Sequence, residues 1–251
     1  MRRPSPVCPT PVKRAVMVQK WENLVYVHWA VDPAVVRAVL PPDLEVDTWD
    51  GKAYVGLIPF QMRGIGLPHL PPVPYLGTFP EVNVRTYVVY NGIPGVWFCS
   101  LDINRLLPTL VARSAYSLPY CFGEVHHKRR DNIVTTTVRR RWPRNNSNFA
   151  SSTLTPSTLI EVEVGEPIFE PTDLEHFLSA RWGLYSATRS GKLRYAAVDH
   201  QQWPLYRASL LHLDDQLVNA AGLGTPPSEP LVMYSPGVNV RVGLPCKISL
   251  V

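Results

Sequence analysis

The sequence predicts a mainly β protein of the α+β class, an antiparallel barrel or curled sandwich with a few short helices at its edges. Segments rich in β-branched and aromatic residues recur along the 251-residue chain and are bounded by turn residues. They do not alternate with helices in the βαβ pattern of a parallel sheet. The 26 prolines are scattered, which suits many short strands and turns. We expect about a dozen strands and about four helices.

The chain begins with a basic, proline-rich stretch that carries no apolar run. Residues 1–19 are therefore expected to form a flexible tail ahead of one domain that spans 20–251. The first strand is expected at Leu24–Val31. Asp32-Pro33 then starts a short helix, because aspartate caps a helix and proline fits its first turn. Two further strands follow, Leu44–Thr48 and Lys52–Met62.

The strongest β signal lies at Val82–Tyr90, where β-branched and aromatic residues predominate. The turn residues Asn91-Gly92 separate this run from a second one, Val96–Ile103, so the two are expected to form a hairpin. A helical pattern then runs from Arg105 to Tyr116. The proline- and glycine-rich segment 63–78 precedes the hairpin and has no periodicity. A loop of that length is often functional, so we expect a lid or rim there.

The second half of the chain continues with hairpins and two helices. Helices are expected over 172–182, where Thr172 or Asp173 is the cap, and over 214–221, where Gly222 is the end signal. Residues 144–155 read as a polar loop. The remaining strands are expected at Phe122–Lys128, Ile133–Trp142, Thr158–Val164, Leu184–Thr188, Leu193–Asp199, Pro204–Leu213, Leu231–Tyr234 and Val238–Val242.

Composition narrows the classes of function. The four cysteines form no CxxC pair and the seven histidines no ligand spacing, so we expect neither a disulfide framework nor a metal, and no cofactor. No apolar run reaches membrane length and no signal peptide is visible, so a cytoplasmic protein is expected. The net charge of +5 is mild. Basic residues gather at 126–130 and 139–144, but a solvated hairpin explains them better than nucleic-acid binding. A homo-oligomer is compatible with the sequence.

Three segments carry a resemblance to a known family. They are LVYVHWAVDPAVVRAVLPPDLEVD at 24–47, TFPEVNVRTYV at 78–88 and the helix end ARSAYSLPY at 112–120. Together they resemble the acetoacetate decarboxylase-like superfamily. FLSARWGLYS at 177–186 and HQQWPL at 200–205 match more closely its YqjF-like branch, a conserved domain of unknown function. The resemblance covers roughly 20–248 and implies a cone-shaped β-barrel around a central cavity.

In the decarboxylases, a lysine pair follows a proline that lies six residues after an arginine, and one of these lysines forms a Schiff base with a β-keto acid. The corresponding positions here are Arg113, Pro119, Tyr120 and Cys121. Neither a phenol nor a thiol can form an imine with a ketone, so Schiff-base decarboxylation is not expected. The family's first-strand arginine is also absent, since Trp29 or Ala30 stands opposite it. The resemblance implies that one pocket acid is kept, as Glu81.

Ionisable side chains on apolar elements are usually paired or line a cavity. Glu81, Arg85, Arg113 and Tyr120 form the first site candidate, with Asp102 on the neighbouring run. The carboxylate and guanidinium groups could orient a carboxylate- or carbonyl-bearing ligand, and Tyr120 could donate a hydrogen bond or act as an acid. The alternative is an internal salt-bridge network that fixes strand register.

His28 and Trp29 lie in the first strand and face opposite sides, so whichever faces inward helps to shape the cavity. A hydrogen-bonded core histidine is the alternative for His28.

Three functions therefore stay open. The protein binds a small organic molecule in a barrel cavity, or it is a non-covalent acid/base enzyme on a keto acid or enolisable carbonyl compound that uses Glu81 and Tyr120. The third is a structural or partner-binding protein whose cavity is filled by side chains.

Overall fold

The computed structural model describes residues 5–143, 155–188 and 190–247. The expected polar loop at 144–155 lies, apart from Thr155, outside the described residues. The helical segments are α1 (Pro33–Arg37), α2 (Leu106–Val111), η1 (Ala112–Tyr116), α3 (Asp173–Ser179) and η2 (Asn219–Leu223). The strands are β1 (Ala15–Val31), β2 (Glu45–Val46), β3 (Ala53–Gly66), β4 (Phe79–Tyr90), β5 (Ile93–Ile103), β6 (Tyr120–Arg130), β7 (Ile133–Trp142), β8 (Ser157–Ile168), β9 (Gly183–Ala187), β10 (Leu193–His200), β11 (Leu205–Asp215), β12 (Leu231–Gly243) and β13 (Cys246–Lys247).

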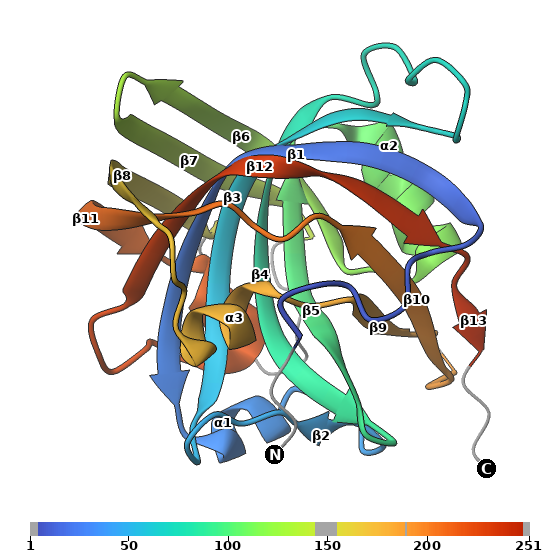
Figure 1. Cartoon of the computed structure of the whole chain (residues 1–251), viewed down its shortest axis with the longest axis horizontal. Helices are drawn as coiled ribbons and strands as arrows, with labels where there is room; N and C mark the ends of the chain where they lie inside the picture. The colour runs from blue at the N-terminus through green and yellow to red at the C-terminus, as the bar shows by residue number, and fades with distance from the viewer. Residues whose placement is uncertain (1–4, 144–154, 189, 248–251) are drawn as a thin grey trace.

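All strands belong to one large curved sheet, whose pairings close into two rings. The short ring runs β1-β3-β4-β5-β9-β10-β12 and returns to β1. The long ring leaves β5 through β6, β7, β8 and β11 before it reaches β12. Both rings share β1, β3, β4, β5 and β12. Strands β6, β7 and β8 extend to one side of the molecule, and β9 and β10 to the other (Figure 1).

The predicted fold class is confirmed: the structure is mainly β, and every pair is antiparallel except β5–β6 and β5–β9. The predicted central hairpin is β4–β5, with Glu81 opposite Ile103 and Tyr90 opposite Ile93. Its turn holds Asn91 and Gly92 at positive φ, which asparagine and glycine tolerate best.

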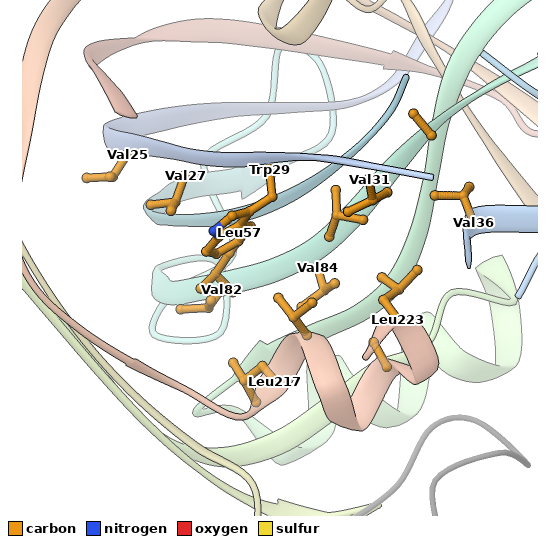
Figure 2. Close-up of a cluster of buried hydrophobic side chains, with 14 of the residues drawn as sticks. Val25, Val27, Trp29, Val31, Val36, Leu57, Val82, Val84, Leu217 and Leu223 are labelled. Atoms are coloured by element: carbon orange, nitrogen blue, oxygen red, sulfur yellow. The ribbon is translucent and has the colours of Figure 1, made fainter. Parts of the chain in front are cut away.

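The shared strands send alternate side chains into the two rings. Aliphatic side chains such as Val82 and Val84 fill the long ring, and the segment that ends in η2 adds Leu217 and Leu223 to the same cluster (Figure 2). Tyr26 and Tyr87, on the opposite faces of β1 and β4, belong to a second cluster inside the short ring.

The N-terminal prediction is wrong for residues 15–19. Strand β1 begins at Ala15, and Val18 pairs with Arg241 of β12. Val12 is buried, and its N–H donates to the Asp199 carboxylate (3.2 Å). The alternating valines of this stretch supply an apolar face that the basic, proline-rich composition obscured.

Several boundaries also differ from the sequence prediction. Strand β2 keeps only Glu45–Val46 of the expected Leu44–Thr48. The two expected final strands form one strand, β12, in which Gly237 adopts a positive φ where an added Cβ would strike the Trp21 carbonyl. Strand β11 runs to Asp215, so the helix expected from 214 begins later. Helix α3 has the expected Thr172 cap, as a capping box with Glu175, and ends at Ser179.

None of the helices in the described ranges combines the length and the apolar character that crossing a bilayer requires.

Candidate functional site

A cavity of about 340 Å³ lies inside the short ring. Every strand of that ring contributes to its wall, and most of the lining side chains are apolar. We call it the ring cavity. Its polar lining includes Glu81, Arg85, Tyr120, Arg181 and His200. Concave, mainly apolar pockets with a few polar groups are typical of small-molecule sites.

Glu81 and Tyr120 form a hydrogen-bonded pair at this cavity. The Tyr120 hydroxyl, at the start of β6, donates to Glu81 Oε2 on β4 (3.0 Å). Burial raises the pKa of Glu81 to about 7, although hydrogen bonds from Tyr120 and Asn83 act in the opposite direction. Burial and the neighbouring carboxylate also raise the pKa of Tyr120 well above its ordinary value. Near neutral pH the pair therefore holds a neutral phenol and a carboxyl group that can gain or lose a proton.

Glu81 lines the cavity and is not paired with an arginine of the described residues. Within the described part of the chain, Glu81 makes no ion pair. Arg85 lies four residues farther along the same strand, a rise of about 13 Å, and its guanidinium turns toward α3. A buried carboxylate without a cation takes up a proton more readily, which agrees with the raised pKa.

Arg85 is buried, and its hydrogen-bond acceptors among the described residues are neutral. Its Nη2 donates to the Leu178 carbonyl (3.0 Å) and to the Tyr87 hydroxyl (3.2 Å). The guanidinium also lies 5.6 Å from the ring centroids of both Tyr26 and Tyr87. Across the described ranges it has no carboxylate partner, and its Nε has no hydrogen-bond partner. Arg85 thus places a positive charge at the α3 end of the ring cavity.

Arg181 is a second buried arginine at this end, and sequence reasoning did not single it out. It makes an ion pair with Asp47 and donates from Nε to the Phe177 carbonyl (2.9 Å). Its guanidinium stacks over the rings of Phe177 (4.2 Å) and Tyr87 (4.5 Å). The available signal was its position inside the family-like segment 177–186.

His28 faces the short ring and Trp29 the long ring. His28 Nε2 is hydrogen-bonded to the Tyr87 hydroxyl (2.6 Å), and Gly56 opposite makes room, because an added Cβ would lie 2.7 Å from Nε2. Burial and then the charges of Arg85 and Arg181 hold the pKa of His28 well below its ordinary value. His28 therefore supports Tyr87 as a neutral group behind the cavity wall, and Trp29 belongs to the long-ring core.

Asp102 is not brought to the ring cavity. It faces the long ring and accepts two hydrogen bonds from Arg140, both 2.7 Å, and both side chains are fully buried. Arg140 also donates to the Ser100 hydroxyl (3.0 Å). The expectation of a wholly solvated basic hairpin is wrong for Arg140, because strand alternation directs every second side chain of its arginine run inward.

Arg113 lies outside the ring cavity as well. It lines a wider, more open groove of about 1070 Å³ beside α2, together with Trp97 and Trp142. Its Nη1 donates to the Tyr120 carbonyl (2.7 Å), and its guanidinium lies 5.1 Å from the Trp142 ring. Arg113 thus fixes the backbone that presents Tyr120. We take the ring cavity as the site because its wall is mainly apolar and holds the buried ionisable groups.

Aromatic side chains form one wall of the ring cavity. Trp21 and Trp203 stack with ring centroids 5.9 Å apart, and His200 lies 5.0 Å from Trp203. Burial lowers the pKa of His200. His200 and Trp203 come from the family-like segment 200–205, and both lie at the cavity surface.

The predicted rim is present at the cavity mouth. Val73 and Leu76, in the loop 67–78, line the cavity together with Leu107 and Val111 of α2. Arg105 joins the two segments, since its guanidinium lies 4.2 Å from the Tyr75 ring. Among the described residues, no group of three or more histidine, cysteine, aspartate or glutamate side chains could hold a metal ion.

The fold of this chain is similar to that of known enzymes. The acetoacetate decarboxylase of Legionella pneumophila superposes with a TM-score of 0.63 at 13% identity, over 96% of this chain and 92% of that one. The enduracididine biosynthesis enzyme MppR complexed with pyruvate gives a TM-score of 0.63 at 16% identity, over 96% and 91%. At these identities the likeness shows the fold alone. The acetoacetate decarboxylase-like fold predicted from the sequence is therefore confirmed.

Sequence comparison is more specific. The uncharacterized protein YqjF of Bacillus subtilis (strain 168) is 31% identical over 221 residues, which are 88% of this chain and 87% of YqjF. The family pattern of DUF2071, an uncharacterized conserved protein, matches residues 18–239. The chain therefore belongs to the DUF2071 family and has an acetoacetate decarboxylase-like fold.

Proposed function

We propose that this protein binds a small carboxylate- or carbonyl-bearing organic molecule in the ring cavity, without covalent catalysis by a lysine. The observation that carries the proposal is the Glu81–Tyr120 pair, with Glu81 buried, in an otherwise mainly apolar cavity. A phenol and a carboxyl group can together donate and accept hydrogen bonds, so they suit a carbonyl or carboxyl group of a ligand. The aromatic wall would hold the apolar part of that ligand.

The structural neighbours support a ligand of this class. MppR has been obtained complexed with pyruvate, and also with the condensation product of pyruvate and imidazole 4-carboxaldehyde. We extend to this chain only the idea that the cavity of this fold accepts small oxo acids. The cytoplasm, where cysteines stay reduced, is the compartment we propose for it.

Schiff-base chemistry does not fit the residues at this site. Tyr120 and Cys121 stand where the related decarboxylases carry lysines, and no lysine lines the ring cavity within the described ranges. Lys20 instead makes an ion pair with Glu22, and Lys247 is exposed. An imine requires a primary amine beside the substrate carbonyl.

The second candidate is an acid/base enzyme that acts on an enolisable carbonyl compound. A pKa of about 7 favours it, because a general base works best when its pKa lies near the working pH. The Glu81 carboxylate would remove a proton from the carbon beside the carbonyl. The Tyr120 hydroxyl would donate to the enolate oxygen that forms, and Glu81 would return the proton. The third function, a structural or partner-binding protein with a filled cavity, has the least support, because the short ring holds a cavity of about 340 Å³.

Three measurements test these proposals together. Calorimetric titration with pyruvate and acetoacetate should show binding that Tyr120→Phe weakens. Proton exchange at the methyl group of pyruvate in heavy water, followed by NMR, should be catalysed by the wild type and lost in Glu81→Gln if the second candidate holds. Borohydride treatment with acetoacetate should leave the protein mass unchanged. A trapped adduct on a lysine would contradict both proposals.

A further inference from the structure

We infer that the ring cavity takes an amphipathic carboxylic acid, with its carboxylate beside Arg85 at the α3 end and its apolar body along the Trp21–Trp203 wall. This inference rests on the proposed function, because it assigns a ligand class to the same cavity. It specifies which end of the cavity binds the ligand carboxylate. It also predicts a preference for ligands whose apolar body is longer than that of pyruvate or acetoacetate.

The charges at the α3 end carry the first step. Arg85 and Arg181 both line the cavity there, and only Arg181 has a carboxylate partner, Asp47. His200 also lines the cavity, and His28 lies behind its wall; burial, together with the charge of Arg85, lowers the pKa of both, so neither supplies a negative charge. Across the described ranges, one buried guanidinium charge is therefore left without an anion. Burying an unpaired charge is costly, and a ligand carboxylate would compensate it with charge-assisted hydrogen bonds.

Glu81 cannot supply that anion. It is the acidic side chain that lines the cavity within the described residues, and it lies about 13 Å from Arg85 along β4. Its carboxyl group is hydrogen-bonded to Tyr120. The cavity therefore offers two separate polar positions: a guanidinium for a carboxylate, and an acid–phenol pair for an oxo or hydroxyl group on the ligand body.

The remaining wall and the mouth favour an apolar body. Trp21 and Trp203 stack along one side, and Phe79 and Met62 add further apolar surface. The mouth is apolar on its outer side as well. Exposed large hydrophobic residues gather in the two segments that flank it: Leu67, Leu70, Val73, Tyr75, Leu106, Leu107, Leu110 and Val111. Exposed apolar surface of this extent often marks a binding groove. A short oxo acid would leave most of this surface unused.

The test compares three probes that separate charge from chain length: octanoate, 1-octanol and butanoate. Calorimetry at pH 7 should show octanoate binding about 10- to 100-fold more tightly than 1-octanol, the effect of one charge-assisted hydrogen bond. Octanoate should bind on the order of 100-fold more tightly than butanoate, because four more methylene groups are buried.

The matched variants are Arg85→Met and Arg129→Met. Arg129 also donates to a tyrosine hydroxyl, that of Tyr234 (2.7 Å), and lies over its ring (5.0 Å), but it is outside the ring cavity. Arg85→Met should weaken octanoate binding about 10- to 100-fold and leave 1-octanol binding unchanged. Arg129→Met should bind both probes as the wild type does.

Equal affinity of the wild type for octanoate and 1-octanol would overturn the inference, and this comparison needs no variant to fold. Unchanged octanoate binding by a folded Arg85→Met protein would overturn it too. Binding of pyruvate without binding of octanoate would overturn the inference and keep the proposed function. Failure of octanoate, 1-octanol, butanoate, pyruvate and acetoacetate alike to bind would overturn both.

Discussion

The short ring and the long ring share five strands, yet one surrounds a cavity and the other is packed. On β4, Val82 and Val84 face the long ring, whereas Glu81 and Arg85 face the short ring. The segment that ends in η2 adds Leu217 and Leu223 to the long-ring core (Figure 2). The difference shows that a single strand can support the core with one face and form a binding site with the other.

The two rings also differ in whether their buried charged side chains are paired. In the long ring, Asp102 and Arg140 form an ion pair with two hydrogen bonds. In the short ring, Glu81 and Arg85 are also buried but do not pair with each other. Removing one partner of a buried ion pair is strongly destabilising, because it leaves the other charge buried and uncompensated. A buried charge that has no partner destabilises the empty protein, and a ligand of opposite charge can compensate it.

The largest loss of stability is expected when the Asp102–Arg140 ion pair is broken. Asp102→Asn leaves Arg140 buried without its anion and should lower the free energy of unfolding by about 3–5 kcal/mol. Arg85→Met removes a buried charge that has no anion, so it should change stability little or raise it. Urea denaturation of both variants without ligand measures the contrast. Similar losses in the two variants would contradict the distinction between the rings.

The next effect concerns pH and Glu81. Its pKa is about 7 in the folded protein and 4.5 in the unfolded chain, so the folded state binds more protons between these values. The stability contributed by protonated Glu81 is fully present below pH 4.5 and is lost as pH rises through about 7, in total about 3 kcal/mol.

Glu81→Gln removes this dependence and keeps the side-chain shape. The wild type and the variant should have similar stability near pH 4.5, and the variant should be more stable by about 3 kcal/mol at pH 8. Urea denaturation across this range, with the wild type as reference, gives the difference directly. Parallel stability curves would mean that Glu81 has an ordinary pKa.

A smaller effect is expected for Tyr120→Phe. This change removes the hydroxyl that donates to Glu81, and Glu81 can take up a proton instead, so stability should fall by only about 1 kcal/mol. Binding of octanoate or pyruvate should weaken. Thermal denaturation and calorimetric titration of the same preparation measure both properties. A loss of several kcal/mol with unchanged binding would favour a structural role.

The sequence predicted the β-rich fold, the β4–β5 hairpin and the α3 cap because local patterns determine them. Turn residues at Asn91-Gly92 and the Thr172–Glu175 capping box are signals read within a few residues. It also predicted Glu81, Arg85 and Tyr120 as site residues, and the structure brings all three to one cavity.

Long-range pairing could not be predicted in the same way. Asp102 and Arg140 lie on strands that the sequence does not place together, so the partner and the face of Asp102 were open. Arg181 lies between α3 and β9, and its ion-pair partner Asp47 lies 134 positions earlier in the chain. Trp21 lies on β1 and Trp203 lies between β10 and β11, and their rings stack although they are distant in the sequence.

The central claim is that the short ring is hollow and the long ring is packed, and one matched pair of variants tests it most directly. Ala196 lines the ring cavity, and Ala53 lies in the long-ring core; both are buried. We expect Ala53→Leu to lose about 1–3 kcal/mol of unfolding free energy through overpacking. Ala196→Leu should place its extra atoms in the cavity and change stability by less than about 0.5 kcal/mol. Equal destabilisation of the two variants in urea denaturation would contradict the claim.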